Sequence, residues 1–188
     1  MIVVFVLLFL LIISPLAFGA GLLNIFEKGI QNLGISPQFA TGVVVFSVLG
    51  SFINLPLTRR ISLNVGGALI PLVLSAYLFL HVPLRETLVA VFFMSILCRV
   101  LSRYIPGKGV VIPFFVPALF STGASFVLAP IHIPEVAFIS AVLGVLIGAD
   151  LARIPFIQSR NSKLSIGGSG VFDAIFLVGI ISALLGGL

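Results

Sequence analysis

The fold class of this chain follows first from residues 134–152, PEVAFISAVLGVLIGADLA. This run is almost entirely apolar, and a helix needs about 20 apolar residues to cross the ~30 Å hydrocarbon core of a bilayer. The rest of the chain has the same character, because 60% of its 188 residues are hydrophobic and only 8% are charged. Soluble domains carry about 25% charged residues, so we expect this surface to face lipid. The sequence predicts an all-α fold, a polytopic membrane helix bundle.

Seven apolar segments fit into this length, as one transmembrane domain that covers residues 1–188. The predicted transmembrane helices run over residues 1–23, 39–57, 65–80, 85–103, 110–130, 134–152 and 168–188. The more polar segment 24–37 is predicted to be a loop or a short interfacial helix. The first run lacks a basic leader and is longer than the core of a signal peptide, so we expect it to be retained as a span.

Basic residues predict the orientation of these segments. Eight of the ten Lys and Arg residues follow the second, fourth and sixth segments: Arg59, Arg60, Arg99, Arg103, Lys108, Arg153, Arg160 and Lys163. The positive-inside rule then places the N-terminus in the cytoplasm and the C-terminus outside, in the plasma membrane. The same pattern favours a fifth segment that crosses fully. The basic residues are spread over short loops, so no nucleic-acid partner is expected despite a pI near 10.2.

Two aspartates are the candidate catalytic residues. Asp150 follows Gly148 near the cytoplasmic end of the sixth segment, and Asp173 follows Gly168 and Gly170 near the start of the seventh. Ionisable groups inside a membrane are costly and usually face a partner or a cavity. The two segments run in opposite directions, so both carboxyl groups are predicted at a similar depth. Carboxylates that share a site hold one proton between them and can activate water for peptide hydrolysis.

Structural roles for the same aspartates compete with this hypothesis. Arg153 lies three residues after Asp150, which is the spacing of a helical ion pair. Asp173 near a helix N-terminus is favoured by the helix dipole and is able to tie that helix end to a loop. A site for a proton or a cation, without hydrolysis, is a third interpretation.

Two short stretches resemble each other: LNVGGA at residues 63–68 and LSIGGS at residues 164–169. Each stretch follows basic residues and opens a predicted span. One interpretation is that the second and third segments form one unit and that the sixth and seventh segments repeat it in parallel. Independently of a repeat, Asn64 is a predicted helix N-cap, and Gly66 and Gly67 permit close backbone packing. Asn54 and Asn64 are further candidates for hydrogen bonds to the carboxylates.

No metal or cofactor is expected. Cys98 is a single cysteine in an apolar run, which gives no metal-ligand spacing. His81 and His132 both fall on the predicted outer side, away from the aspartates. No glycine-rich nucleotide loop is present in the sequence.

The stretches LNVGGALIP, GADLARIP and SIGGSGVFDAIFLVGI resemble the domain of unknown function 1614 family. The resemblance covers residues 50–188 and implies a multipass membrane protein without an assigned activity. A weaker similarity is to the intramembrane aspartyl proteases, namely presenilin, signal peptide peptidase and prepilin peptidase. Asp150 and Asp173 match the two aspartates of that group. The sequence departs from the group's Gly-x-Gly-Asp motif because two extra residues separate Gly170 from Asp173, which in a helix rotates the carboxylate by roughly 200°.

Three classes of function follow from these residues. An intramembrane aspartyl peptidase acting on a membrane-embedded peptide predicts carboxylates that face each other in a cavity. A small transporter or channel coupled to a proton or a cation predicts a polar path through the bundle. A structural or scaffold subunit predicts aspartates that are fully bonded, with no cavity beside them.

Overall fold

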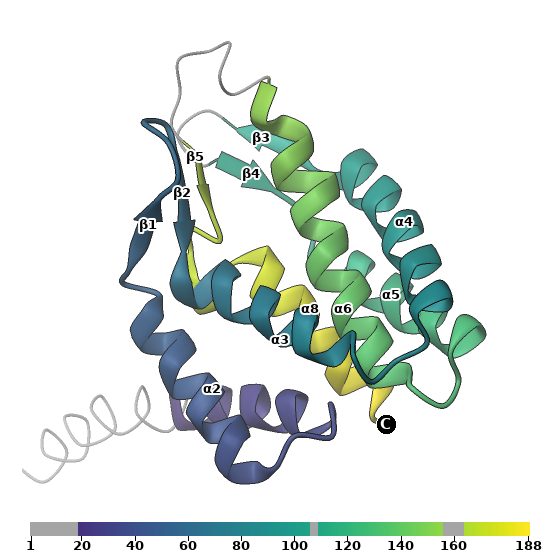
Figure 1. Ribbon diagram of the computed structural model, residues 1–188. Coiled ribbons are helices and arrows are strands. Elements are labelled where there is room, and N and C mark those ends of the chain that lie inside the picture. Colours follow the sequence, from purple (N-terminus) through teal and green to yellow (C-terminus); the bar gives the residue numbers. More distant parts are fainter. Residues whose placement is uncertain (1–18, 106–108, 156–163) are drawn as a thin grey trace, which may run out of the picture.

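The computed structural model describes residues 19–105, 109–155 and 164–188, and helices dominate these parts of the chain (Figure 1). The predicted all-α class is therefore confirmed in its main content. Residues 19–31 form the first described helix. The helices that follow are α2 (Pro37–Gly50), α3 (Ile70–Leu78), α4 (Leu84–Leu101), α5 (Phe115–Leu128), α6 (Ile133–Val145) and α8 (Ala174–Gly186). Most of the predicted first span lies outside the described residues.

Two of these helices carry irregular turns. A π-helical turn over Val65–Leu69 precedes α3. A second π-turn over Leu146–Asp150 and a 3-10 turn over Leu151–Arg153 extend α6. The extended α6, Ile133–Arg153, is the one described helix that is long and apolar enough to cross a membrane.

The other apolar helices are shorter than the sequence predicts. α2 and α5 have 14 residues and α8 has 13, so each is about 20 Å long at a rise of 1.5 Å per residue. The shortfall occurs because β1 and β4 replace one end of the segments 39–57 and 110–130, and a 3-10 turn over Gly170–Phe172 replaces the start of 168–188. The segment 24–37, predicted as a loop or short helix, is helical up to residue 31 and buries Phe26 and Ile30.

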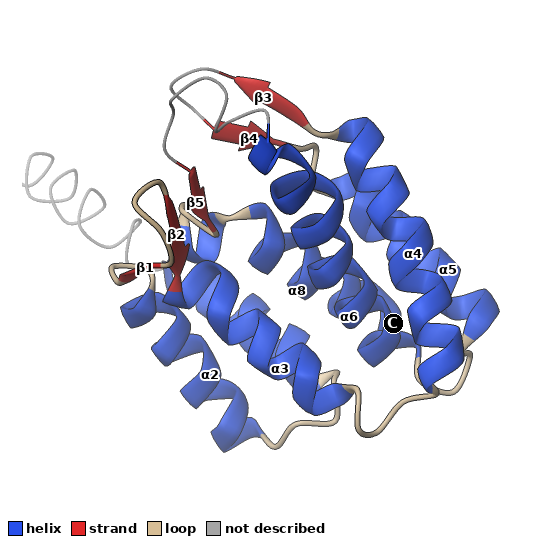
Figure 2. Ribbon diagram, turned by 45° about the horizontal axis from the view of Figure 1, so that its top comes forward, coloured by secondary structure: helices blue, strands red, loops and turns tan. Residues whose placement is uncertain are grey.

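Five short strands in the described residues correct the purely helical prediction. Strands β1 (Asn54–Pro56) and β2 (Ile61–Asn64) are antiparallel, and β5 (Leu164–Ile166) pairs in parallel with β2. Strands β3 (Arg103–Ile105) and β4 (Gly109–Val111) form a separate hairpin. All five strands gather at one end of the helices (Figure 2). β1 and β4 lie mainly in predicted helical segments, whereas β2, β3 and β5 lie mainly in the predicted connections between them. Three or four residues are too few to show a distinct periodicity, so the sequence pattern did not reveal these strands.

The two ends of the bundle carry different residues. The end with the strands, here called the basic end, holds the β1–β2 turn with Arg59 and Arg60, the last turn of α4 with Arg99, and Arg153. The predicted gathering of basic connections at one end is thus found among the described residues. Lys108, Arg160 and Lys163 lie outside the described residues.

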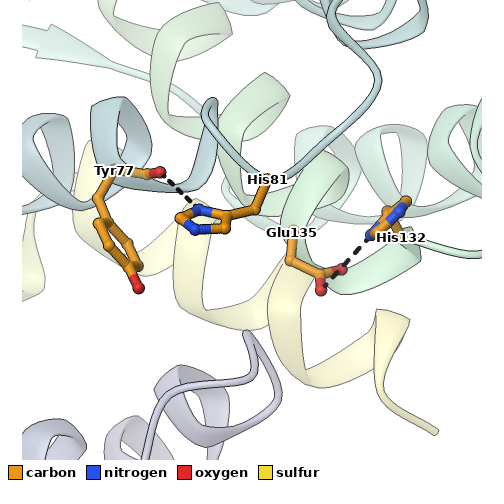
Figure 3. Close-up of polar contacts among 4 residues, drawn as sticks. All are labelled: Tyr77, His81, His132 and Glu135. Atoms are coloured by element: carbon orange, nitrogen blue, oxygen red, sulfur yellow. Dashed lines mark hydrogen bonds and ion pairs between the residues drawn. The ribbon is translucent and has the colours of Figure 1, made fainter.

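The opposite end holds both histidines. The His81 ring lies 3.1 Å from the Tyr77 carbonyl oxygen, and His132 Nδ1 lies 3.9 Å from Glu135 Oε1 (Figure 3). Both histidines therefore make local contacts at turns, as predicted, and neither is near the aspartates at the basic end.

The helices alternate in direction from residue 19 to the C-terminus. The helix over residues 19–31 runs parallel to α8, because Phe26 contacts Phe176 with ring centroids 5.2 Å apart and Asn32 Nδ2 donates to the Ala183 carbonyl. α6 is central, and α3, α4, α5 and α8 pack against it (Figure 1). α5 runs from the basic end to the histidine end beside α8. This arrangement brings the end of α6 and the start of α8 together.

Candidate functional site

A cavity of about 690 Å³ lies at the basic end, between the β3–β4 hairpin, β5, the end of the extended α6 and the start of α8. Its described lining consists of Tyr104, Gly109, Val110, Val111, Ile112, Phe114, Val145, Ala149, Asp150, Leu164, Ser165, Gly168, Ser169, Phe172, Asp173, Ala174 and Leu177. Both predicted aspartates belong to this lining. The cavity brings together the two residues that the sequence analysis placed on separate segments.

Asp150 is the last residue of the π-turn in the extended α6 and is only 9% exposed. Its turn presses on α4, because Gly148 has no Cβ and lies directly against the Ser95 carbonyl and the Cys98 Cβ. Among the described residues, no hydrogen bond or ion pair engages the Asp150 carboxyl group. A carboxyl group that no protein group engages is available to a molecule in the cavity that it lines. An aspartate kept in that state beside a cavity is typical of a functional site.

Asp173 is held firmly by backbone groups. It is the N-cap of α8: its Oδ1 accepts from the Ile175 N–H at 3.1 Å, and its Oδ2 lies 3.4 Å from the Ser169 N–H. The predicted structural role at a helix N-terminus is therefore confirmed. The same side chain also lines the cavity, so capping and a role in the cavity coexist at Asp173.

Asp150 and Asp173 line the same cavity from two elements, the end of the extended α6 and the start of α8. The 200° rotation expected from the two extra residues does not arise, because no continuous helix joins the glycines to Asp173. Gly170 opens a 3-10 turn over Gly170–Phe172, and Asp173 itself is extended, with φ −73° and ψ 152°. This change of backbone conformation brings Asp173 into the cavity.

Arg153 does not pair with Asp150, so the ion-pair interpretation is wrong. The Arg153 Nη2 instead donates to the Ser102 carbonyl oxygen and lies 3.4 Å from the Ser102 hydroxyl oxygen at the end of α4. Because Ser102 at the end of α4 engages the guanidinium group, the spacing of three residues does not produce the i,i+3 helical pair. The cavity consequently keeps one carboxyl group without a cationic partner among the described residues.

Asn54 and Asn64 contact each other rather than the aspartates. Asn64 Oδ1 accepts from the Gly67 N–H at 2.8 Å, which confirms it as an N-cap, and its Nδ2 donates to the Ser51 carbonyl at 2.8 Å. Its Nδ2 also lies 3.2 Å from Asn54 Oδ1, which accepts from the Ser165 hydroxyl at 3.1 Å. The prediction that these asparagines bond the carboxylates is wrong, because their amides link β1, β2 and β5.

The predicted glycines allow the two similar stretches to touch. A Cβ on Gly66 would collide with the Ser47 carbonyl, and one on Gly67 would collide with the carbonyls of Gly167 and Gly170. Gly167 and Gly170 have positive φ of 71° and 62°, which disfavours any other residue there. The backbone after β2 therefore crosses directly over the backbone after β5. This crossing supports the segment that ends at Asp173.

The apolar part of the cavity wall could not be predicted from the sequence. Tyr104, Val110, Ile112 and Phe172 belong to it, yet they carry no sequence signal that distinguishes them from lipid-facing residues. Their contribution depends on the β3–β4 hairpin, which only the fold reveals. Among the described residues, no cluster of His, Cys, Asp and Glu is suited to hold a metal ion.

Comparison with known families gives one result. The model of the family described as "Protein of unknown function (DUF1614)" matches residues 22–185. Comparison with curated proteins gives no match, and comparison with solved structures gives none.

Proposed function

This chain belongs to the DUF1614 family, and we propose that it is a multipass membrane protein in which Asp150 and Asp173 form an aspartyl-type peptidase site. The cavity that contains both carboxyl groups is the observation that carries the catalytic part of this proposal. The proposed substrate is a membrane-embedded peptide. The proposed location is the plasma membrane, with the basic end in the cytoplasm and the C-terminus outside.

The distribution of polar and apolar side chains supports the membrane part. Large apolar side chains are exposed along helix faces, with Phe46 on α2 at 68% and Phe92 on α4 at 61%. Small polar side chains are instead fully buried, including Ser121, Ser140 and Ser182. Soluble proteins rarely expose continuous apolar surface, whereas membrane helices pack through small polar residues.

The surroundings of the two carboxyl groups suggest different roles. Asp173 receives two backbone N–H groups, which stabilise its charged form, and Asp150 has no donor among the described residues. When the two carboxyl groups share one proton, it therefore resides on Asp150.

In the proposed reaction, the Asp173 carboxylate takes a proton from a water molecule in the cavity. The hydroxide oxygen bonds to the peptide carbonyl carbon, while Asp150 donates its proton to the carbonyl oxygen. Collapse of the tetrahedral intermediate breaks the C–N bond, and the proton held by Asp173 passes to the leaving amine. The proton of the intermediate's hydroxyl returns to Asp150. The cycle uses one water molecule and restores both groups.

The transporter alternative requires a polar path through the bundle. The deep wall of the cavity is formed by Val145 and Leu177, which are apolar. The scaffold alternative requires aspartates whose carboxyl groups are fully hydrogen-bonded or ion-paired. The Asp150 carboxyl group has no hydrogen bond or ion pair with any described residue. These two features favour hydrolysis over the alternatives.

The proposal is tested with a photoreactive peptide that carries a hydroxyethylene group in place of the scissile amide, which mimics the tetrahedral intermediate. The full chain in phosphatidylcholine vesicles should be labelled, and Asp150→Asn and Asp173→Asn should each abolish labelling. Asn is as good an N-cap as Asp, so Asp173→Asn keeps the fold. Labelling that is absent from the wild type, or equal in all three proteins, would refute the peptidase.

A further inference from the structure

A second hollow lies on the outer surface, between α4 and the end of the extended α6, on a side of the molecule separate from the aspartate cavity. This lateral groove has a volume of about 580 Å³ and is almost wholly apolar. Its lining consists of Leu88, Val91, Phe92, Ser95, Ile96, Arg99, Val100, Ile147, Gly148 and Ala152. From Leu88 to Val100 it follows α4 for about 18 Å. One leaflet provides about half of the ~30 Å hydrocarbon core, so the groove matches the depth of one leaflet.

Two cationic groups meet at the basic end of this groove. Arg99 is exposed in its lining, and Arg153 follows directly after Ala152, another residue of the lining. Among the described residues neither has a carboxylate partner, and the Arg153 Nε is buried without a hydrogen bond. Two cationic side chains at one end of an apolar groove complement a ligand that joins an anionic group to an apolar chain.

We propose that the lateral groove binds one anionic phospholipid, with its phosphate at Arg99 and Arg153 and an acyl chain along α4. The inference rests on the membrane part of the proposed function and is independent of the peptidase chemistry. Arginine donors are well suited to phosphate oxygens. A second copy of this chain fits the groove poorly, because the chain has ten basic and five acidic residues and a formal net charge of +5.

The absence of tryptophan from the chain provides a clean test. Phe92→Trp places a single fluorophore in the groove. Phe46→Trp places one at the middle of α2, on an exposed face that does not line the groove. The full chain carrying either reporter is reconstituted in dioleoylphosphatidylcholine vesicles with a minor fraction of phosphatidylglycerol. In paired samples, either the phosphatidylglycerol or an equal fraction of the phosphatidylcholine has brominated acyl chains, which quench tryptophan on contact.

At the Phe92→Trp reporter, brominated phosphatidylglycerol should quench more strongly than brominated phosphatidylcholine, with an apparent preference of at least about fivefold. That factor corresponds to the ~1 kcal/mol that one Arg near the membrane surface contributes to binding an anionic lipid. Adding Arg99→Gln should reduce the preference about fivefold. Adding Arg85→Gln, at the opposite end of the same helix, should leave it unchanged. The Phe46→Trp reporter should be quenched equally by both lipids.

The outcomes distinguish the proposed lipid site from the proposal that the chain is a membrane protein. Equal quenching of both reporters by both lipids would refute the lipid site and leave the membrane proposal intact. Quenching at Phe46→Trp but not at Phe92→Trp would mean that a second copy or another protein covers the groove, which also refutes the site. No quenching of either reporter would overturn the membrane proposal as well. A preference that survives Arg99→Gln would show that Arg99 does not recognise the headgroup.

Discussion

Replacing Gly67 by alanine tests the backbone crossing that supports the aspartate cavity. The added Cβ would lie only 2.5 Å from the Gly170 carbonyl oxygen, which is 0.9 Å short of the 3.4 Å at which ordinary contacts begin, and it would also strike the Gly167 carbonyl. Both obstacles are backbone atoms, so no side-chain rotation relieves them. Overpacking costs typically 1–3 kcal/mol, and we expect ~3 kcal/mol here.

Gly42→Ala is the matched control, since Gly42 lies inside α2 and a Cβ added there would have no neighbouring atom within 4 Å. Alanine in a helix interior is favoured over glycine by about 0.5–1 kcal/mol. At about 2–4 °C per kcal/mol for a chain of this size, Gly67→Ala should lower Tm by about 6–12 °C. Gly42→Ala should raise Tm by about 1–4 °C.

The assay is thermal unfolding of the purified full chain in detergent, followed by circular dichroism, together with labelling by the photoreactive peptide. Gly67→Ala should also lose labelling, because its clash displaces the segment that ends at Asp173. If Gly67→Ala melts within about 2 °C of the wild type and is labelled normally, the backbone after β2 does not lie directly against the backbone after β5, and the crossing is refuted.

Three further substitutions test the polar contacts by the same melting assay. Asp173→Ala removes the N-cap of α8 and should cost about 1 kcal/mol, whereas Asp173→Asn should melt near the wild type; equal losses would exclude capping. Asn64→Ala leaves the buried Gly67 N–H without its acceptor and should cost about 1–3 kcal/mol; an unchanged Tm would contradict that bond. Ser182→Ala removes the 2.7 Å contact between the Ser121 and Ser182 hydroxyls and should cost about 0.6 kcal/mol; a higher Tm would show that this contact does not stabilise the bundle.

The sequence predicted the helices where apolar runs were long and clearly bounded. The segment 134–152 was found as Ile133–Arg153, and 85–103 as Leu84–Leu101. The segments 39–57 and 110–130 were predicted too long, because strands β1 and β4 interrupt apolar runs that carry no sequence mark of the change. Strand pairing depends on contacts between distant segments, which a single periodic pattern does not contain.

For the site, sequence analysis identified both aspartates but not all of their contacts. Buried charge in an apolar chain is costly enough to mark Asp150 and Asp173 without a structure. The helix dipole predicted a role for Asp173 near a helix N-terminus, but its exact place as the N-cap did not follow from the sequence, because α8 begins at Ala174 and the predicted segment began at residue 168. The partner of Arg153 could not be predicted, because Ser102 is 51 residues away in sequence and approaches only through the packing of α4 against the extended α6. The direct crossing of the two glycine stretches has the same origin.

The protonation state of Asp150 and Asp173 shows whether the two carboxyl groups share a proton. The chain has only five Asp and Glu residues, so the infrared band of a protonated carboxyl group can be assigned by substitution. For the full chain in phosphatidylcholine vesicles at neutral pH, we predict one such band, which disappears in Asp150→Asn and shifts in frequency in Asp173→Asn. Absence of the band in the wild type, or an unchanged band in Asp150→Asn, would contradict a proton shared in this cavity.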